Sequence, residues 1–281
     1  MSDRELLINL GCGERFHSDW LNLDLSASSA DVVQCDLTKG IPVADGKARM
    51  VYSSAVLEHI PRIFVGGFLA ECYRVLKPGG ILRLSVPDFE AQAVQYLNLL
   101  QRQRAGENVT QLREWIILEI IDQFSRERPG GEMIGFLNGC SDASKDYVLQ
   151  RFGEEASGLF QSLKRDAPDT LSHAVPGPVR VRFGRLGRLL LRLLVPGFRG
   201  NSDLQAWEVG RFRMFSGELH RWMYDDCELG QVMNEAGFTQ AVRQPHGESR
   251  LENWTSYGLE VTQAGVTRKP DLFVMESVKP L

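Results

Sequence analysis

The sequence has no apolar run long enough to cross a membrane and no cysteine spacing typical of a metal site. Its most apolar stretch, LGRLLLRLLVP, is interrupted by arginine and falls short of the roughly 18 to 20 residues that a span requires. The 5 cysteines stand singly, with no C-x-x-C pair. We therefore expect no bound metal and no disulfide framework, and the reduced cysteines favour a cytoplasmic location.

The chain also has little net charge. A formal net charge of -4 over 281 residues excludes a strong overall attraction to nucleic acid or to an anionic membrane. Hydrophobic residues make up 43% and charged residues 24%, which allows a sizeable core. The length fits one large α/β domain with an insertion or two smaller domains, and we favour the first.

Short apolar runs alternate with polar turns from Glu5 to Val86, which is the pattern of a parallel α/β sheet. A helix is expected over about Arg62 to Leu76, because apolar residues recur there at helical spacing and PGG follows. Five strands are expected in this region: Leu6 to Leu10, Leu21 to Leu25, Asp31 to Cys35, Arg49 to Ser53 and Ile81 to Val86.

Helical patterns replace the strands between about Glu90 and Leu219, most clearly over Thr110 to Phe124. The α/β pattern then returns with a helix over Asp226 to Gly237. Two more strands are expected near Thr239 to Gln244 and Leu272 to Val278, so the C-terminal part completes the sheet.

The turn after the first expected strand indicates a bound nucleotide. LLINLGCG places Gly11 and Gly13 in that turn, and WLNLDL ends the second strand with Asp24. Glycines let the backbone approach a ligand, and a carboxylate at the tip of the next strand can accept both hydroxyls of a ribose. A tight turn followed by a helix cap remains the alternative interpretation.

A dinucleotide-binding enzyme is the competing class. Its G-x-G-x-x-G motif needs a glycine where Phe16 stands, and its acidic residue usually lies about 20 residues further on. The segment from Glu14 to Trp20 is too short for a crossover helix, which needs roughly ten residues or more. We expect a turn or loop there, whose successive N–H groups form an anion-binding nest.

Further polar groups follow expected strands at the same edge. Asp36, in VVQCDLTKGIP, can accept from an adenine amino group while Leu37 covers the ring; a solvated turn aspartate is the alternative. Carboxyl ends of parallel strands are where α/β proteins bind ligands. The stretch VYSSAVLEHI adds four polar residues beyond the fourth strand: Ser53, Ser54, Glu58 and His59.

Taken together, LINLGCG, LDL, CDLTKGIPV, VYSSAVLEHIP and ECYRVLKPGGILRLSVPD resemble the class I S-adenosylmethionine-dependent methyltransferases of the methyltransferase-11 type. GCGERFHSDWLNLDL, HRWMYDDCELGQVMNEAGF and RKPDLFVMESVKP are similar to a subgroup associated with saccharide or natural-product pathways. The resemblance implies a Rossmann-like sheet, mostly parallel with an antiparallel last strand. It assigns residues 1–90 and 218–281 to the cofactor-binding domain and leaves 91–217 as a mostly helical insertion, a substrate or lid region.

The resemblance implies S-adenosylmethionine as the cofactor. It places the two glycines at the methionine portion, Asp24 at the ribose and Asp36 at the adenine. Asn9 stands where many relatives have an acidic residue, so His17 is expected to help to hold the amino group of the donor. The implied cofactor-binding set is Gly11, Gly13, His17, Asp24, Leu25, Asp36, Leu37 and Ser53.

Methyl transfer from a sulfonium requires an aligned acceptor and, for a hydroxyl, a group that takes its proton. His59, Asp88 and His220 are the candidate catalytic residues. Each has a structural alternative, because His59 can bridge the loop before the helix, Asp88 can cap the next helix and His220 can pack among core-like neighbours.

We expect a methyltransferase that acts on a hydroxyl of a saccharide or natural-product intermediate, with no nucleic-acid partner. The alternative is a non-catalytic module that keeps the scaffold and docks to a membrane or a partner through its arginine-rich segment, Val179 to Gly200. For this segment we favour a packed helix with a solvated arginine face. The oligomeric state is not indicated by the sequence.

Overall fold

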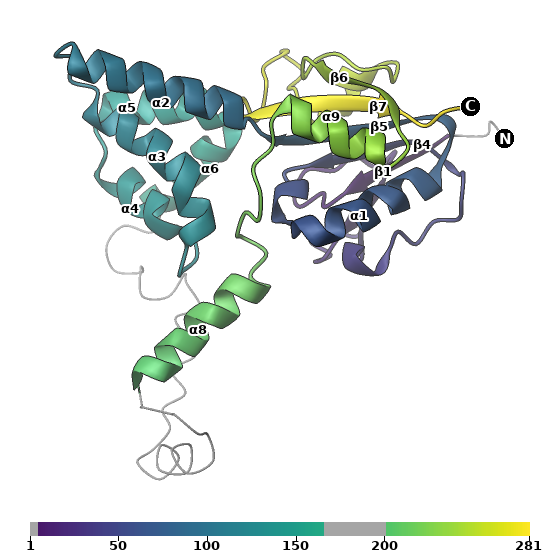
Figure 1. Ribbon diagram of the computed structural model, residues 1–281, viewed down its shortest axis with the longest axis horizontal. Coiled ribbons are helices and arrows are strands. Elements are labelled where there is room, and N and C mark those ends of the chain that lie inside the picture. The colour runs from purple at the N-terminus through teal and green to yellow at the C-terminus, as the bar shows by residue number, and fades with distance from the viewer. Residues whose placement is uncertain (1–4, 166–200) are drawn as a thin grey trace, which may run out of the picture.

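The computed structural model describes residues 5–165 and 201–281, and a seven-stranded sheet lies at its centre (Figure 1). The strand order is β3-β2-β1-β4-β5-β7-β6, and β7 runs antiparallel to both of its neighbours. This confirms the expected Rossmann-like sheet with an antiparallel last strand. The strands are β1 (Leu6–Leu10), β2 (Leu21–Asp24), β3 (Val32–Gln34), β4 (Ala48–Ser54), β5 (Leu76–Pro87), β6 (Thr239–Gln244) and β7 (Leu272–Val278).

Strands β1, β6 and β7 have the expected ends, β2, β3 and β4 differ from them by one residue at one or both ends, and β5 differs most. This strand begins at Leu76 rather than Ile81, because Leu76 pairs with Ala48 across an irregular register before the regular ladder starts at Met50 and Ile81. The lysine, proline and glycines of KPGG therefore lie inside a strand. Helix α1 (Arg62–Val75) ends directly before it.

One face of the sheet is covered by α1 and α9 (Asp226–Glu235), which lie side by side in front of the strands in Figure 1. Their buried residues, such as Leu69 and Leu229, join strand residues such as Ile8 and Leu82 in the largest hydrophobic core cluster. Asp225 begins α9 by accepting from the Glu228 backbone N–H at 2.8 Å.

The opposite face is covered by the long connection between β6 and β7, which contains the short helix η3 (Trp254–Tyr257). Trp254 packs edge-on against Trp20 and Tyr52, with ring centroids 6.1 and 5.2 Å away. Two more short helices, η1 (Leu37–Lys39) and η2 (Leu57–His59), follow β3 and β4. Turns alone join β1 to β2, as the short connection predicts.

The segment between β5 and α9 is helical in its described part and lies mostly beside the sheet (Figure 1). Trp115, Met133 and Phe152 contribute to its own hydrophobic cluster. The buried carboxylate of Glu119 is paired there with Arg151 at 2.6 Å. Its helices are α2 (Phe89–Arg104), α3 (Thr110–Ser125), α4 (Gly131–Gly139), α5 (Asp142–Phe152), α6 (Glu154–Arg165) and α8 (Asn201–Phe215).

The start of α6 is fastened to the sheet domain. The Glu154 backbone N–H donates to the Arg268 carbonyl at 3.0 Å, and its carboxylate pairs with Arg15 at 2.9 Å and with the Arg268 guanidinium. Gly153 makes this approach feasible, since its φ is +56° and a Cβ atom there would lie 2.3 Å from the Arg268 carbonyl oxygen. Helix α6 is thereby held against the turn that follows β1.

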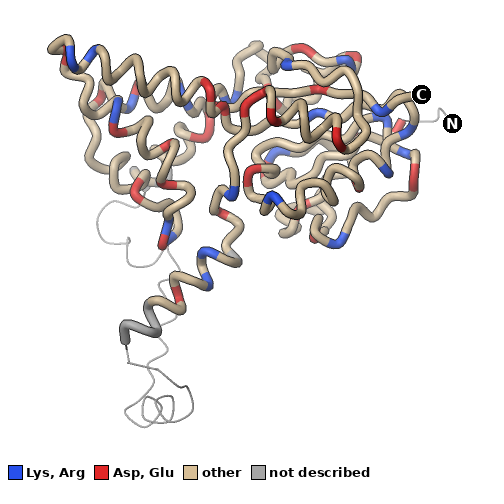
Figure 2. Tube along the Cα trace, in the orientation of Figure 1, with Lys and Arg blue, Asp and Glu red and all other residues tan. Residues whose placement is uncertain are grey.

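Charges of both signs occur on most of the elements drawn in Figure 2. In the part of the chain that the structure describes, no helix is long and apolar enough to span a membrane. The arginine-rich segment Val179 to Gly200 lies outside the described residues, so its expected membrane or partner contact stays a prediction.

Candidate cofactor and acceptor site

Gly11 begins the turn at the carboxyl end of β1. Its backbone N–H donates to the Leu23 carbonyl at 2.8 Å, which holds the turn against β2. Its φ is +63°, and a Cβ atom there would lie 2.3 Å from Cγ2 of Val56. Glycine is thus required at this position both by backbone conformation and by close packing.

Gly13 and Asp24 meet across the same turn. The Gly13 backbone N–H donates to Oδ2 of Asp24 at 2.9 Å, and the Ser26 backbone N–H donates to Oδ1 at 3.0 Å. A Cβ atom on Gly13 would have no neighbour within 4 Å, so the backbone faces open space. The carboxylate is partly exposed at the tip of β2, where a ligand can approach it.

Asp36 lies one strand further along the edge. Its carboxylate accepts from the Thr38 backbone N–H at 3.1 Å and from the Thr38 hydroxyl at 2.6 Å, and these bonds lower its pKa. The Cys35 backbone N–H donates to the Asp24 carbonyl at 2.7 Å, so the ends of β2 and β3 stay together. The two glycines, Asp24 and Asp36 thus occupy successive turns of one sheet edge.

A cavity of about 600 Å³ opens beside this edge, within the usual size range for small-molecule sites. The turn from Gly11 to Arg15 forms one wall, and strand residues Tyr52, Ser54 and Ser85 line another part. Asn9 and Ala55 also line the cavity. Helix α6, the connection between β6 and β7 and the first residue of β7 complete the lining with Glu154, Glu155, Gly158, Leu159, His246, Leu259, Glu260, Arg268, Lys269 and Leu272.

The predicted cofactor residues occupy different parts of this arrangement. Only the two glycines are among the residues that line the cavity. Ser53 is buried and donates to the Leu10 carbonyl at 3.1 Å, while Leu25 is 66% exposed. The ring of His17 meets that of Tyr257 edge-on at 5.2 Å. Roles for these side chains therefore stay predictions, as do those of Asp24, Asp36 and Leu37.

The candidate catalytic residues lie elsewhere. None of the three belongs to the cavity lining in the described residues. Asp88 caps α2 by accepting from the Ala91 backbone N–H at 2.9 Å and also pairs with Arg243. His59 and His220 pack edge-on, with ring centroids 4.9 Å apart. The proposed capping of α2 by Asp88 is thus present, and a proton-accepting role is left as a prediction for all three.

Several lining residues had no signal in the sequence. Ser85 follows the general alternation of its strand, but its hydroxyl is buried and has no hydrogen-bond partner. His246 and Glu260 come from a connection without a recognised motif, and their side chains lie 3.4 Å apart. Glu155 and Lys269 pair at 3.2 Å across the cavity wall. These groups add polar and charged side chains to the cavity lining.

Two buried carboxyls lie close to this wall. Burial raises the pKa of Glu58 to about 8. Burial also raises the pKa of Asp271 to about 7, with the nearby carboxylates of Glu155 and Glu119 adding to the shift. The Asp271 side-chain atom Oδ1 has no hydrogen-bond partner, so its ionised form is poorly compensated.

The raised pKa of Asp271 predicts that the free energy of unfolding falls as the pH rises. In the unfolded chain its pKa is 3.8, so between pH 3.8 and 7 the folded state binds more protons and stability falls as pH rises. Asp271→Asn should therefore be more stable than the parent protein at pH 8, by up to roughly 4 kcal/mol, and nearly equal to it below pH 4. Urea unfolding from pH 4 to pH 8 measures this. If the difference in unfolding free energy between the two proteins were the same at every pH in that range, ionisation of Asp271 would not be its cause.

Residues 8–84 match the family described as "Methyltransferase domain". The match covers β1 to most of β5 and includes both glycines and Asp24. No curated protein matches the chain.

Solved structures with similarity include a S-adenosylmethionine-dependent methyltransferase from Mesorhizobium loti, with 20% identity and a TM-score of 0.23 over 30% of this chain and 46% of that one. Another, from Thermotoga maritima, has 11% identity and a TM-score of 0.36, covering 98% and 81%. The 1,6-didemethyltoxoflavin-N1-methyltransferase of Burkholderia thailandensis has 11% identity and a TM-score of 0.37, covering 98% and 71%.

The residues of the glycine turn fit the expected cofactor. Gly13 leaves its backbone open and Gly11 allows the turn to pack closely against Val56, beside a cavity large enough for a nucleoside-sized ligand. The Asp24 carboxylate lies at the adjoining strand end, where a ribose binds in this kind of sheet. Together with the domain match, these features support a class I methyltransferase fold whose cofactor is S-adenosylmethionine.

Proposed function

We propose that the protein transfers a methyl group from S-adenosylmethionine to a hydroxyl of a saccharide or natural-product intermediate. Residues 1–90 and 218–281 bind the cofactor, and residues 91–217 contribute the acceptor side. The observation that supports this most directly is one cavity lined both by the glycine turn and by polar groups of α6 and β5.

When bound, the cofactor supplies a methyl group on a positively charged sulfur. The chain must hold the acceptor oxygen in line with that methyl group, so that the O–C bond forms as the S–C bond breaks. The hydroxyl proton leaves to a nearby basic group or to water. Because alignment provides most of the rate enhancement, a rigid wall such as the Glu154–Arg268 attachment matters more than a single strong base.

The polar lining favours a hydroxylated acceptor over an apolar one. Ser85 offers a buried hydroxyl without a partner, and Glu155 and Lys269 add a charged pair at the same cavity. A buried hydroxyl without a hydrogen-bond partner is unfavourable in free energy. A ligand that forms a hydrogen bond with Ser85 removes this penalty and therefore binds more tightly. A sugar or polyhydroxylated intermediate supplies such groups in quantity.

Binding and turnover test the proposal separately. Calorimetry with S-adenosylmethionine and with NAD should show saturable binding only of the former. Incubation with a panel of saccharide and polyhydroxylated acceptors should then release S-adenosylhomocysteine with at least one of them. Binding of NAD alone would refute the cofactor, and donor binding without turnover on any acceptor would favour the non-catalytic module.

Ser85→Ala tests the acceptor side of the cavity. With a hydroxylated acceptor the variant should show KM raised up to about tenfold, because one neutral hydrogen bond contributes roughly 0.5 to 1.5 kcal/mol. The donor dissociation constant should stay unchanged. Steady-state kinetics and calorimetry give both values. An unchanged KM would show that Ser85 does not contact the acceptor.

A further inference from the structure

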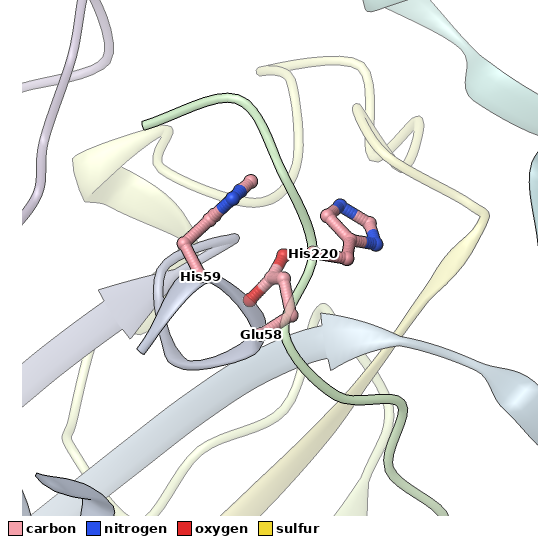
Figure 3. A group of neighbouring side chains, drawn as sticks. All are labelled: Glu58, His59 and His220. Atoms are coloured by element: carbon pink, nitrogen blue, oxygen red, sulfur yellow. The ribbon is translucent and has the colours of Figure 1, made fainter. Parts of the chain in front are cut away.

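Three side chains outside the cavity converge at the end of β4, and Figure 3 shows Glu58, His59 and His220 facing one another. We call them the Glu58–His59–His220 cluster. Each offers one ligand atom, and the three atoms lie within 4.8 Å of one another. Glu58 and His59 come from η2, whereas His220 comes from the segment that leads to α9. His59 also contacts the carbonyl of Leu219, the residue before His220, which is 160 positions away in the chain.

Two atoms of this cluster are buried without a partner. Oε2 of Glu58 and Nδ1 of His220 have no hydrogen bond, although the two residues are only 1% and 6% exposed. Removing a carboxylate oxygen and an imidazole nitrogen from water without compensation is unfavourable. A cation held between these atoms would satisfy both at once.

The third member has the orientation of a metal-binding histidine. Nδ1 of His59 lies 3.1 Å from the Leu219 carbonyl oxygen. Since a carbonyl only accepts, this bond places the proton on Nδ1 and leaves the lone pair of Nε2 free. Metal-binding histidines commonly donate their other ring N–H to a carbonyl or carboxylate in this way.

We propose that Glu58, His59 and His220 bind one divalent transition-metal ion, with Zn²⁺ as the best-matched probe. Two imidazole nitrogens and one carboxylate oxygen form a donor set typical of zinc sites that keep a fourth position open. A tetrahedral site with bonds of about 2.1 Å requires donors about 3.4 Å apart. The ligand atoms now lie within 4.8 Å of one another, so they would have to move closer by up to about 1.4 Å.

The electrostatic surroundings permit a cation. Of three basic groups near the histidines, Arg126 pairs with Asp122 at 2.8 Å and Lys269 pairs with Glu155 at 3.2 Å, whereas the Arg221 guanidinium donates to the Arg213 carbonyl at 2.6 Å.

The site would add to the backbone and ring contacts that already join these parts of the chain. The Arg221 backbone N–H donates to the Glu58 carbonyl at 2.6 Å, and the His220 backbone N–H donates to the Gln123 carbonyl at 3.1 Å. A metal here therefore fixes the end of β4 to the returning segment and, through it, to α3. Its expected effect is to hold the helical region in place beside the cofactor edge.

Calorimetry on chelator-treated protein tests the proposal, with Zn²⁺ as titrant. Because Asp225, Asp226 and Cys227 form a second, more exposed group of potential ligands, every protein carries Cys227→Ser. We expect one equivalent to bind. In His220→Ala and in the near-isosteric Glu58→Gln, Zn²⁺ binding should weaken at least 100-fold. Replacing even a residue that only hydrogen-bonds to a metal ligand weakens metal binding about 10- to 100-fold. His17→Ala, which removes a histidine outside the cluster, should leave the affinity unchanged.

Co²⁺ provides an independent readout. Its absorption bands should show nitrogen and oxygen coordination with fewer than six ligands in the parent protein and should be absent in His220→Ala. Circular dichroism of Glu58→Gln checks that loss of binding does not come from unfolding. Equal Zn²⁺ affinity in the parent protein and both cluster variants would overturn the proposal, as would the absence of a one-equivalent site in the parent protein. S-adenosylmethionine affinity, measured separately, tests the proposed function alone.

Discussion

Arg83→Met should destabilise the folded protein by about 3 to 5 kcal/mol, the usual cost of removing one partner from a buried ionic group. Arg83 lies on β5 and is fully buried, with its guanidinium bonded to Glu276 at 2.8 Å and to Glu260 at 3.1 Å. Its guanidinium carbon also lies 4.4 Å from the centre of the Trp254 ring. Methionine fills much of the volume but leaves two carboxylates without their cation.

Urea unfolding at pH 7, followed by tryptophan fluorescence and circular dichroism, measures the change. Arg102→Met is the matched control, because Arg102 pairs with Glu107 at 2.8 Å on the surface, with both side chains more than 40% exposed. That variant should lose less than about 1 kcal/mol. If Arg83→Met loses no more than the control, the buried group is not paired as described.

A rescue variant separates charge from packing. Glu260→Gln and Glu276→Gln, added to Arg83→Met, remove both carboxylates and should restore part of the lost stability, because replacing a whole buried ionic group costs less than breaking it. Glu276 also accepts from the Ser249 hydroxyl and from the Arg250 backbone N–H at 3.0 Å, bonds that glutamine keeps only in part. Recovery is therefore expected to be incomplete.

The sheet was predictable because its strands are short apolar runs between clear turns. The limits of β1, β6 and β7 match those read from the sequence, and α3 begins at Thr110 as predicted. The start of β5 was not predictable, because KPGG normally ends an element and here pairs with β4 through an irregular register. Local sequence patterns thus predicted the helices and strands, but not the pairing of Leu76 with Ala48 between β5 and β4.

The site was predictable only on the side where motifs occur. Glycines at a strand end identify a turn that approaches a ligand, and the cavity does include Gly11 and Gly13. The other wall comes from α6 and from the β6–β7 connection, where Glu155 and His246 have no local pattern that points to a site. Position after a strand was also too coarse a guide, since Ser54 lines the cavity while His59, five residues later, packs against His220.

Asp24→Ala should weaken S-adenosylmethionine binding by about 100-fold or more. Two hydroxyls of a ribose donating to one carboxylate contribute roughly 1.5 to 3 kcal/mol each, and 1.4 kcal/mol corresponds to a factor of ten. The fold should survive, because the side chain is partly exposed and its bonds to the backbone N–H groups of Gly13 and Ser26 are local. Asp31→Ala, which removes an exposed carboxylate before β3, should bind normally.

Analogues distinguish a direct ribose contact from a loosened turn. S-adenosylhomocysteine and 5′-methylthioadenosine share the ribose, so Asp24→Ala should weaken all three ligands by a similar factor. A 2′-deoxy analogue should bind more weakly than its parent to the unaltered protein, yet almost as well as its parent to Asp24→Ala, because the partner of that hydroxyl is already gone. If both proteins discriminate equally against the deoxy ligand, Asp24 acts only by supporting Gly13, and the carboxylate does not bind the ribose.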